Sequence, residues 1–191
     1  RLNERRQLNT SEENKKLAYL LDLKTICIVD LVYGMTLLQV SHDSKIDWLE
    51  LNETAHKLLY RDKKMRLTLL DCRTGQRHAI LSYCTFVQWV TGSDVVVAQS
   101  RNNACVWYNI DTPDKVSMFP VRGEIVDVVR GDGKTEILTQ DGNHQLGYEL
   151  DEGLVEFGTA VHDSDFGRAI LFLESLGPGV DADGMWQNLA D

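Results

Sequence analysis

The stretch most suggestive of chemistry is RGDGKT at 130–135, which looks like the end of a nucleotide-binding phosphate loop. Such a loop needs a glycine five residues before its Gly-Lys-Thr, where this chain has Val128. It also needs a following helix whose backbone N–H groups point at the phosphates. The residues after the stretch are typical of a strand. We therefore interpret residues 131–133 as a hairpin turn and expect no cofactor there.

Five histidines and four cysteines could serve a metal site or nucleophilic catalysis. No two histidines lie at positions i and i+4 of one helical pattern, and none lies near a cysteine at a zinc-ligand spacing. The nucleophile elbow of serine hydrolases and the Cys–His–Asn pattern are absent from the sequence. The sequence therefore predicts no enzyme, no catalytic, cofactor-binding or metal-binding residue, and no small-molecule substrate.

Composition narrows the class of partner. The 191 residues carry a net charge of -9, with 43% hydrophobic and 26% charged residues, which is ordinary for a globular protein. A net negative field disfavours nucleic acids and anionic membranes as partners. Two basic clusters occur, RLNERR at 1–6 and RDKKMR at 61–66, and both contain acids. We interpret them as solvated loops rather than a phosphate site.

The cysteines and the apolar runs indicate the cellular compartment in which the chain is expected. None of the cysteines forms a CxxC pair, and three lie in or beside strand-like apolar runs, where a free thiol behaves as a small hydrophobic group. No signal peptide opens the chain, and no apolar run reaches the length of a membrane span. We expect an intracellular, reducing compartment and no transmembrane segment.

A repeat of about 40 residues organises most of the sequence. Four apolar runs each close on a polar residue, with steps of 41, 38 and 40 residues between these positions: Asp30, Asp71, Asn109 and Glu149. In three units a glycine follows four residues later and predicts a turn: Gly34, Gly75 and Gly153. The same unit therefore recurs along the chain, as it does in solenoids and propellers.

Each unit contains further strand candidates. An apolar run precedes each closing run by about ten residues, and a short polar link between the two is the signature of a hairpin. A third strand is predicted before several of these hairpins and a fourth after two of them. The predicted strands outside the closing runs are 17–21, 46–51, 57–61, 77–81, 86–90, 95–99, 116–120, 125–129 and 135–139.

Four short strands per unit at this period are typical of WD40-type blades. The Gly-His pair expected near each blade start is absent. We predict a mainly β fold, a partial WD40-type β-propeller of about four blades over 1–160. Three tryptophans in the predicted strands are expected to pack between blades rather than bind a ligand, because buried aromatics dominate β cores: Trp48, Trp89 and Trp107.

The alternation stops after Gly153. Apolar residues then recur at helical spacing from Phe166 to Leu173, which predicts an amphipathic helix capped by Asp163 or Ser164.

A second short helix is predicted to begin around residues 181–183. Its Trp186 and Leu189 are candidate solenoid contacts, against the propeller or a next repeat. One helical pair cannot bury its own apolar face, so we predict that 161–191 is the start of a TPR-like α-helical repeat region, a short helical hairpin that begins an α-solenoid.

Four stretches closely resemble the intraflagellar transport protein 172 family. They are NKKLAYLLDLKTICIVDL at 14–31, DWLELNETAHKLLYRDKKMRL at 47–67, VQWVTGSDVVVAQSRNNACVWYNID at 87–111 and DEGLVEFGTA at 151–160. The resemblance implies a chain that covers the end of a second WD40 propeller and the start of a TPR-like solenoid. It also implies a non-catalytic scaffold that supports cilium assembly and cargo transport, with other intraflagellar transport complex B subunits as partners. The implied location is the cytoplasm and the cilium, at the basal body and axoneme.

The repeat alone leaves a second function open. A vesicle-coat or nuclear-pore scaffold of propeller–solenoid type would show the same pattern, and only the specific resemblance separates the two. An enzyme that uses a propeller as a substrate platform is disfavoured, because the sequence offers no polar triad and no metal cluster.

Overall fold

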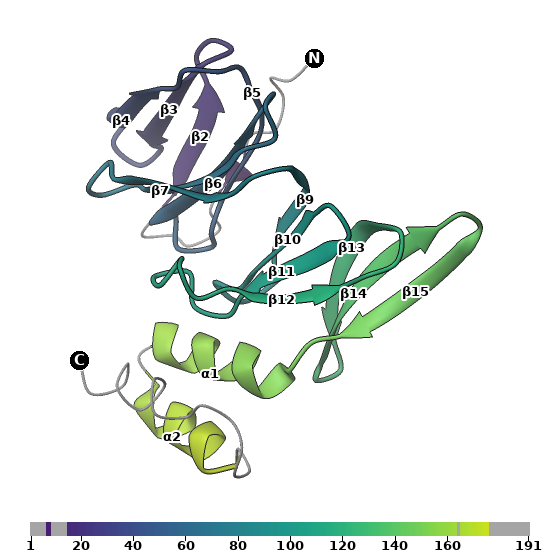
Figure 1. Cartoon of the computed structure of the whole chain (residues 1–191). Coiled ribbons are helices and arrows are strands. Elements are labelled where there is room, and N and C mark those ends of the chain that lie inside the picture. The colour runs from purple at the N-terminus through teal and green to yellow at the C-terminus, as the bar shows by residue number, and fades with distance from the viewer. Residues whose placement is uncertain (1–6, 9–14, 164, 176–191) are drawn as a thin grey trace. The chain divides into compact units, whose positions relative to one another are not determined.

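A computed structural model describes residues 7–8, 15–163 and 165–175 of the chain (Figure 1). The described chain is mainly β, with antiparallel sheets followed by two short helices, which confirms the predicted fold class. It divides into two compact units, residues 1–85 and residues 86–191. We call them the first and the second unit and describe each by itself.

The first unit holds two four-stranded sheets in which each strand pairs with the next one along the chain. The strands of the first sheet are β1 (Gln7–Leu8), β2 (Lys16–Leu20), β3 (Thr25–Asp30) and β4 (Met35–Ser41). Those of the second sheet are β5 (Ile46–Leu51), β6 (Lys57–Asp62), β7 (Leu67–Asp71) and β8 (Arg77–Leu81).

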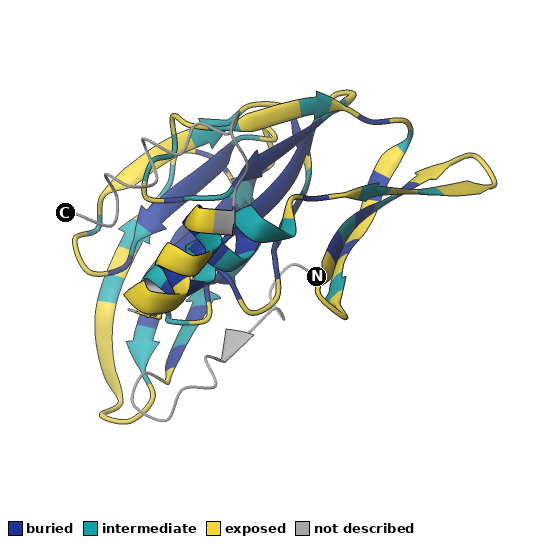
Figure 2. Cartoon of the chain, turned by 90° about the horizontal axis from the view of Figure 1, so that it is seen from below, coloured by how far each residue is buried: buried dark blue, intermediate teal, exposed yellow. Residues whose placement is uncertain are grey.

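Apolar side chains of these two sheets share one core. Ile26 and Ile28 of β3 are buried with Leu58 and Tyr60 of β6 and Leu70 of β7. The inner strands are therefore covered on both faces, whereas β4 and β8 are largely exposed (Figure 2). This arrangement is that of two consecutive blades packed face to face.

The second unit contains one four-stranded and one three-stranded sheet, followed by the helices. The first sheet comprises β9 (Cys84–Trp89), β10 (Val96–Ser100), β11 (Asn103–Trp107) and β12 (Ser117–Pro120). The second comprises β13 (Glu124–Gly131), β14 (Lys134–Asp141) and β15 (His144–Glu149). The helices are α1 (Glu152–His162) and α2 (Phe166–Ser175).

The core of the second unit joins both sheets to the first helix. Val97 and Val106 of the first sheet lie in one cluster with Ile137 of β14 and Val155 of α1. A smaller cluster, which includes Phe157 and Ala169, packs α1 against α2. Neither helix within the described residues is long and apolar enough to span a membrane.

The predicted strands match the observed ones closely, but β1 and β4 were not predicted. The turn predicted at Gly153 is wrong, because this residue lies in the first turn of α1. That helix begins there because the Asp151 carboxylate accepts a hydrogen bond from Leu154 N at 3.1 Å. The helical segment thus starts ahead of residue 161, the predicted domain boundary.

Helix α2 confirms the amphipathic pattern that starts at Phe166. Its cap is Asp165, whose Oδ1 accepts from Arg168 N at 3.1 Å, rather than Asp163. The predicted second helix, with its candidate contacts Trp186 and Leu189, lies outside the described residues.

Candidate functional site

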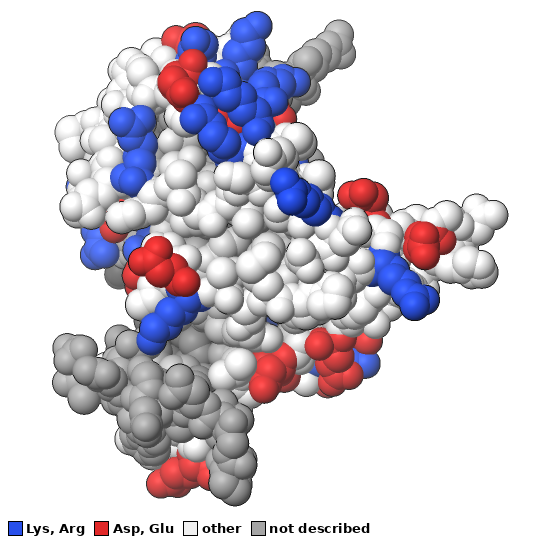
Figure 3. Space-filling view, in the orientation of Figure 1, with Lys and Arg blue, Asp and Glu red and all other residues white. Residues whose placement is uncertain are grey.

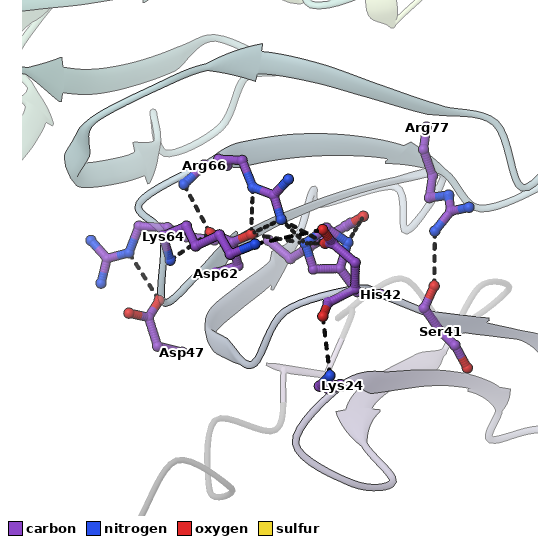
Figure 4. Close-up of polar contacts among 11 residues, drawn as sticks. Lys24, Ser41, His42, Asp47, Asp62, Lys64, Arg66 and Arg77 are labelled. Carbon is purple, nitrogen blue, oxygen red and sulfur yellow. Dashed lines mark hydrogen bonds and ion pairs between the residues drawn. The ribbon is translucent and has the colours of Figure 1, made fainter.

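A cluster of charged side chains lies at one end of the first unit (Figure 4). At its centre is the fully buried carboxylate of Asp62, the last residue of β6. Its Oδ1 accepts from the backbone N–H groups of Lys64 at 2.9 Å and Arg66 at 3.0 Å. Its Oδ2 contacts Arg66 Nε at 2.8 Å and His42 Nε2 at 2.9 Å. The carboxylate therefore organises the β6–β7 turn and joins it to the segment before β5.

His42 joins that segment to the second sheet of the first unit. It lies between β4 and β5, and its ring packs edge-on against Tyr60, with ring centroids 5.1 Å apart. A His near the blade start is part of the WD40 signature, and His42 fills this place with Ser41 where the signature has glycine. The search for Gly-His missed it for this reason. A His shortly before a strand and an Asp at the end of the next strand is the signal that could have found it.

The environment of Asp62 keeps its carboxylate charged. Burial alone would raise the pKa of Asp62, but hydrogen bonds from the Arg66 backbone, His42 and the Arg66 guanidinium outweigh that effect and lower it. Beside it, the hydrogen bond from Arg66 lowers the pKa of Asp43 and raises that of the guanidinium. The group is thus an ion-pair network in which each charge has an opposite partner.

His42, Asp43 and Asp62 place three potential metal ligands within 4.8 Å of one another. The guanidinium of Arg66 already occupies the position between the two carboxylates, with Nη2 at 2.5 Å from Asp43 Oδ1 and 2.7 Å from Asp62 Oδ2. A divalent cation would have to displace that guanidinium from both carboxylates. The arrangement is therefore suited to holding the loops in place rather than to binding a metal ion.

Three loops of the first unit are tied together around this network. The backbone N–H of His42 donates to Lys24 O in the β2–β3 turn, and Lys24 Nζ donates to Asp43 O at 3.1 Å. The backbone N–H of Lys63 in the β6–β7 turn donates to Lys45 O at 2.7 Å. These bonds hold residues 21–24, 42–45 and 63–66 as one surface.

In the second unit a neutral side chain links neighbouring sheets. The buried amide of Gln99, in β10, donates to Gly123 O at 2.9 Å and accepts from Ile125 N at 2.7 Å. Gly123 has φ 77°, and a Cβ there would lie 2.2 Å from Gln140 O, so only glycine fits. The amide therefore fixes the entry of the chain into β13.

Arg130, near the end of β13, joins helix α1 to both sheets of the second unit. Its Nη1 donates to Thr91 O at 3.1 Å and Gly92 O at 3.2 Å, in the loop after β9. On the helix side it pairs with Glu152 at 2.9 Å and with Glu156. One guanidinium thus holds the start of the helical segment against the sheets.

The RGDGKT stretch forms a hairpin turn, as predicted. β13 ends at Gly131 and β14 begins at Lys134, and the two turn residues Asp132 and Gly133 have φ 53° and 72°, the positive values of a type I′ turn. Lys134 Nζ is 2.7 Å from Glu136 Oε1. Its hydrogen bonds to that residue and then to Glu149 raise the pKa of Lys134. The lysine is paired with carboxylates instead of facing a phosphate cradle.

The three tryptophans predicted to pack between blades are all buried. Trp48 and Trp89 lie in β5 and β9, the first strands of their sheets. Trp107 is fully buried in the inner strand β11, and its Nε1–H donates to Pro113 O at 2.9 Å. That these residues hold the blades together stays a prediction.

All four cysteines are buried free thiols: Cys27, Cys72, Cys84 and Cys105. Burial raises the pKa of the Cys72 thiol to about 12 and also raises that of Cys105. Both thiols are therefore protonated at neutral pH and are poor nucleophiles.

Curated relatives match the whole chain. It is 62% identical to the intraflagellar transport protein 172 homolog of Drosophila melanogaster and 58% identical to that of Danio rerio, each over 190 residues and 100% of the chain. Intraflagellar transport protein 172 of Chlamydomonas reinhardtii is 49% identical over 95% of the chain. The chain matches a segment of the intraflagellar transport protein 172 homologues. It spans about 11% of the length of the first two and 10% of the third. No family model matches the sequence.

Solved structures share the fold at low identity. A crystal structure of the eukaryotic initiation factor aligns with a TM-score of 0.56 and 14% identity, over 78% of this chain and 41% of that one. Dihydro-heme d1 dehydrogenase NirN in complex with DHE aligns with a TM-score of 0.55 and 14% identity, over 72% of this chain and 32% of that one. At this identity the likeness concerns the fold alone.

Proposed function

We propose that the chain is a non-catalytic scaffold segment of intraflagellar transport complex B. It supports cilium assembly and ciliary cargo transport through contacts with other subunits of that complex. The observation that carries the proposal is the match of 47–62% identity to intraflagellar transport proteins from animals and a green alga, along nearly the entire chain. The same match favours this role over the vesicle-coat or nuclear-pore alternative.

The side-chain chemistry supports a scaffold. In the charged cluster of the first unit Arg66 neutralises Asp62, and in the hairpin Lys134 is paired with Glu136. Such internally satisfied groups stabilise loops rather than attack a substrate. The helical pair after β15 is the proposed start of the TPR-like solenoid, and Arg130 is the residue that fixes its direction.

Localisation of the protein that carries this chain tests the proposal. We expect a fluorescent tag at its native locus to mark the basal body and the axoneme in ciliated cells, and affinity purification to recover complex B subunits. A Golgi or nuclear-envelope pattern, with coat or pore proteins in the purification, would overturn it. Nucleotide hydrolysis that disappears in Lys134→Ala would contradict the non-catalytic part.

A further inference from the structure

The two units differ sharply in charge. Residues 15–85 contain eleven Lys and Arg against eight Asp and Glu, whereas residues 86–175 contain six against fifteen. Figure 3 shows Lys and Arg side chains gathered over the end of the first unit at the top of the view. We call this surface the basic rim. It is defined by these side chains of the three hydrogen-bonded loops described above: Leu21, Leu23, Lys24, Lys45, Lys63, Lys64, Met65 and Arg66.

The carboxylates near the basic rim are already engaged inside the first unit. Asp22 accepts from Lys24 N at 2.7 Å and from Thr25 Oγ1 at 2.8 Å. Asp43 and Asp62 share the guanidinium of Arg66. Asp43 also lies 3.9 Å from Lys64 Nζ, so these acids engage Arg66 and Lys64 but, within the described chain, form no ion pair with the other exposed lysines of these loops.

Three ammonium groups of the rim form no ion pair with a carboxylate among the described residues, and of these only Lys24 is attracted by a neighbouring acid, Asp22. Lys24 Nζ donates to the neutral carbonyl of Asp43. Lys45 and Lys63 are exposed, and within the described chain no hydrogen bond or ion pair is found for either ammonium group. A main-chain hydrogen bond of 2.7 Å between these two residues holds their backbones together, so two exposed lysines extend from adjoining loops. Like charges so placed favour a ligand that carries the opposite charge.

The same loops expose apolar side chains. Leu21 is 56% exposed, and Leu23 and Met65 are also among the exposed large hydrophobic residues. Met65 has φ 57°, where glycine or asparagine is favoured, so the fold itself does not call for a methionine at this position. Exposed Leu and Met beside unpaired lysines fit a ligand that is both acidic and apolar.

We propose that the basic rim binds an acidic segment of a partner protein, in which carboxylates are interspersed with apolar side chains. Its carboxylates pair with Lys24, Lys45 and Lys63, and its apolar side chains cover Leu23 and Met65. A lipid headgroup surface fits less well, because the overall charge of -9 repels an anionic membrane and a short segment touches only the rim. The inference rests on the proposed scaffold role and adds to it the chemistry of one partner.

A binding measurement tests the basic rim. The probe is a fluorescein-labelled 14-residue peptide of Glu and Asp interspersed with Leu and Phe, titrated with the purified chain by fluorescence anisotropy. We expect Lys45→Glu/Lys63→Glu to weaken binding about tenfold or more, because attraction becomes repulsion. Met65→Asn suits the turn and should weaken binding about threefold through lost apolar contact. The control Lys115→Glu/Arg122→Glu, at exposed sites of the second unit, changes the net charge equally and should bind like the wild type.

Several outcomes overturn the inference. Absence of peptide binding at low salt rejects it, as does an equal loss in the rim and control double variants. Binding to vesicles rich in phosphatidylserine, with no binding to the peptide, assigns the rim to a membrane instead. Circular dichroism and melting of each variant ensure that a lost complex is not an unfolded chain. If the rim variant loses the peptide but still enters complex B in cells, the scaffold proposal stands and the rim serves a partner outside the complex.

Discussion

The two units share one construction, a pair of antiparallel sheets over an apolar core, but link neighbouring sheets with different chemistry. The first unit uses the buried carboxylate of Asp62 with Arg66 and His42, and the second uses the buried amide of Gln99 with Gly123 and Ile125. Both side chains belong to the second strand of their sheet. These two sheets thus each carry a buried hydrogen-bonding side chain on this strand, charged in the first unit and neutral in the second.

The chemistry of each linking side chain suits the charge of its unit. The first unit is rich in basic residues, which supply the guanidinium that a buried carboxylate needs. The second unit is rich in acids, and a neutral amide there avoids adding another buried negative charge. The described part of the first unit thus carries more basic than acidic residues, and its exposed cations are available to a partner.

The largest expected effect is in the second unit, at Trp107. Replacement Trp107→Ala should cost about 3–5 kcal/mol in the free energy of unfolding, because it empties a fully buried position in an inner strand. Trp107→Phe is the matched control, since it keeps much of the apolar volume and loses the hydrogen bond to Pro113 O. Urea unfolding measures both. An alanine variant that melts like the wild type but loses a partner would show that Trp107 is a binding residue.

A comparison of Asp62→Ala with Gln99→Ala probes the links between sheets directly. Asp62→Ala leaves the Arg66 Nε–H and two turn N–H groups without their acceptor and should cost about 2–3 kcal/mol; part of the loss is recovered because Arg66 is partly exposed and keeps its ion pair with Asp43. Gln99→Ala removes neutral hydrogen bonds and should cost about 1–2 kcal/mol. Equal losses in the two variants would refute the idea that charge sets the strength of the link.

The sequence predicted the blades better than the contacts between their loops. Alternation and turn residues are local signals, so hairpins such as β6–β7 and the Gly131–Gly133 turn could be located from the sequence. The network of His42 and Asp62 joins residues 20 positions apart, and strand alternation alone does not reveal it, because its signal is a His before one strand paired with an Asp at the end of the next. The basic rim was missed for the same reason, because Lys24 and Lys45 come from different loops than the cluster at 61–66.

The start of the helical segment was missed through one ambiguous residue. Gly153 follows Glu149 at the spacing of the turn glycines in the earlier units, so the repeat favoured a turn. The Asp151 cap decided otherwise, because it satisfies an N–H group of the first helical turn and lets the apolar residues behind it pack on the sheets.

The attachment of α1 should depend on Arg130. Arg130→Met keeps the apolar stem but removes the bonds to Thr91 O, Gly92 O and Glu152, and should lower the local stability of the helix by about 1–2 kcal/mol. Hydrogen exchange measures it, as faster exchange of α1 amides with little change in the strands. The control is Arg122→Met, at an exposed position of the same unit. Uniformly faster exchange across the unit would mean that Arg130 supports the whole core rather than the helix.

The smallest expected effect is a pH dependence of the free energy of unfolding. The charged side chain of Asp62 should give such a dependence, and the neutral side chain of Gln99 should not. The native pKa of Asp62 is lowered, so as the pH falls below about 5 the unfolded chain takes up a proton first, near the ordinary aspartate value of about 3.9. The stabilisation by Asp62 is therefore complete above that value and is lost as the pH falls through the native pKa. Subtracting the unfolding free energy of Asp62→Asn from that of the wild type isolates this term from the other acids. The difference should shrink on acidification, whereas the same subtraction with Gln99→Ala should stay flat between about pH 6 and 3. A flat difference for Asp62 as well would mean that its carboxylate gains nothing from Arg66 and His42, and the contrast between the two units would then reduce to hydrogen bonding alone.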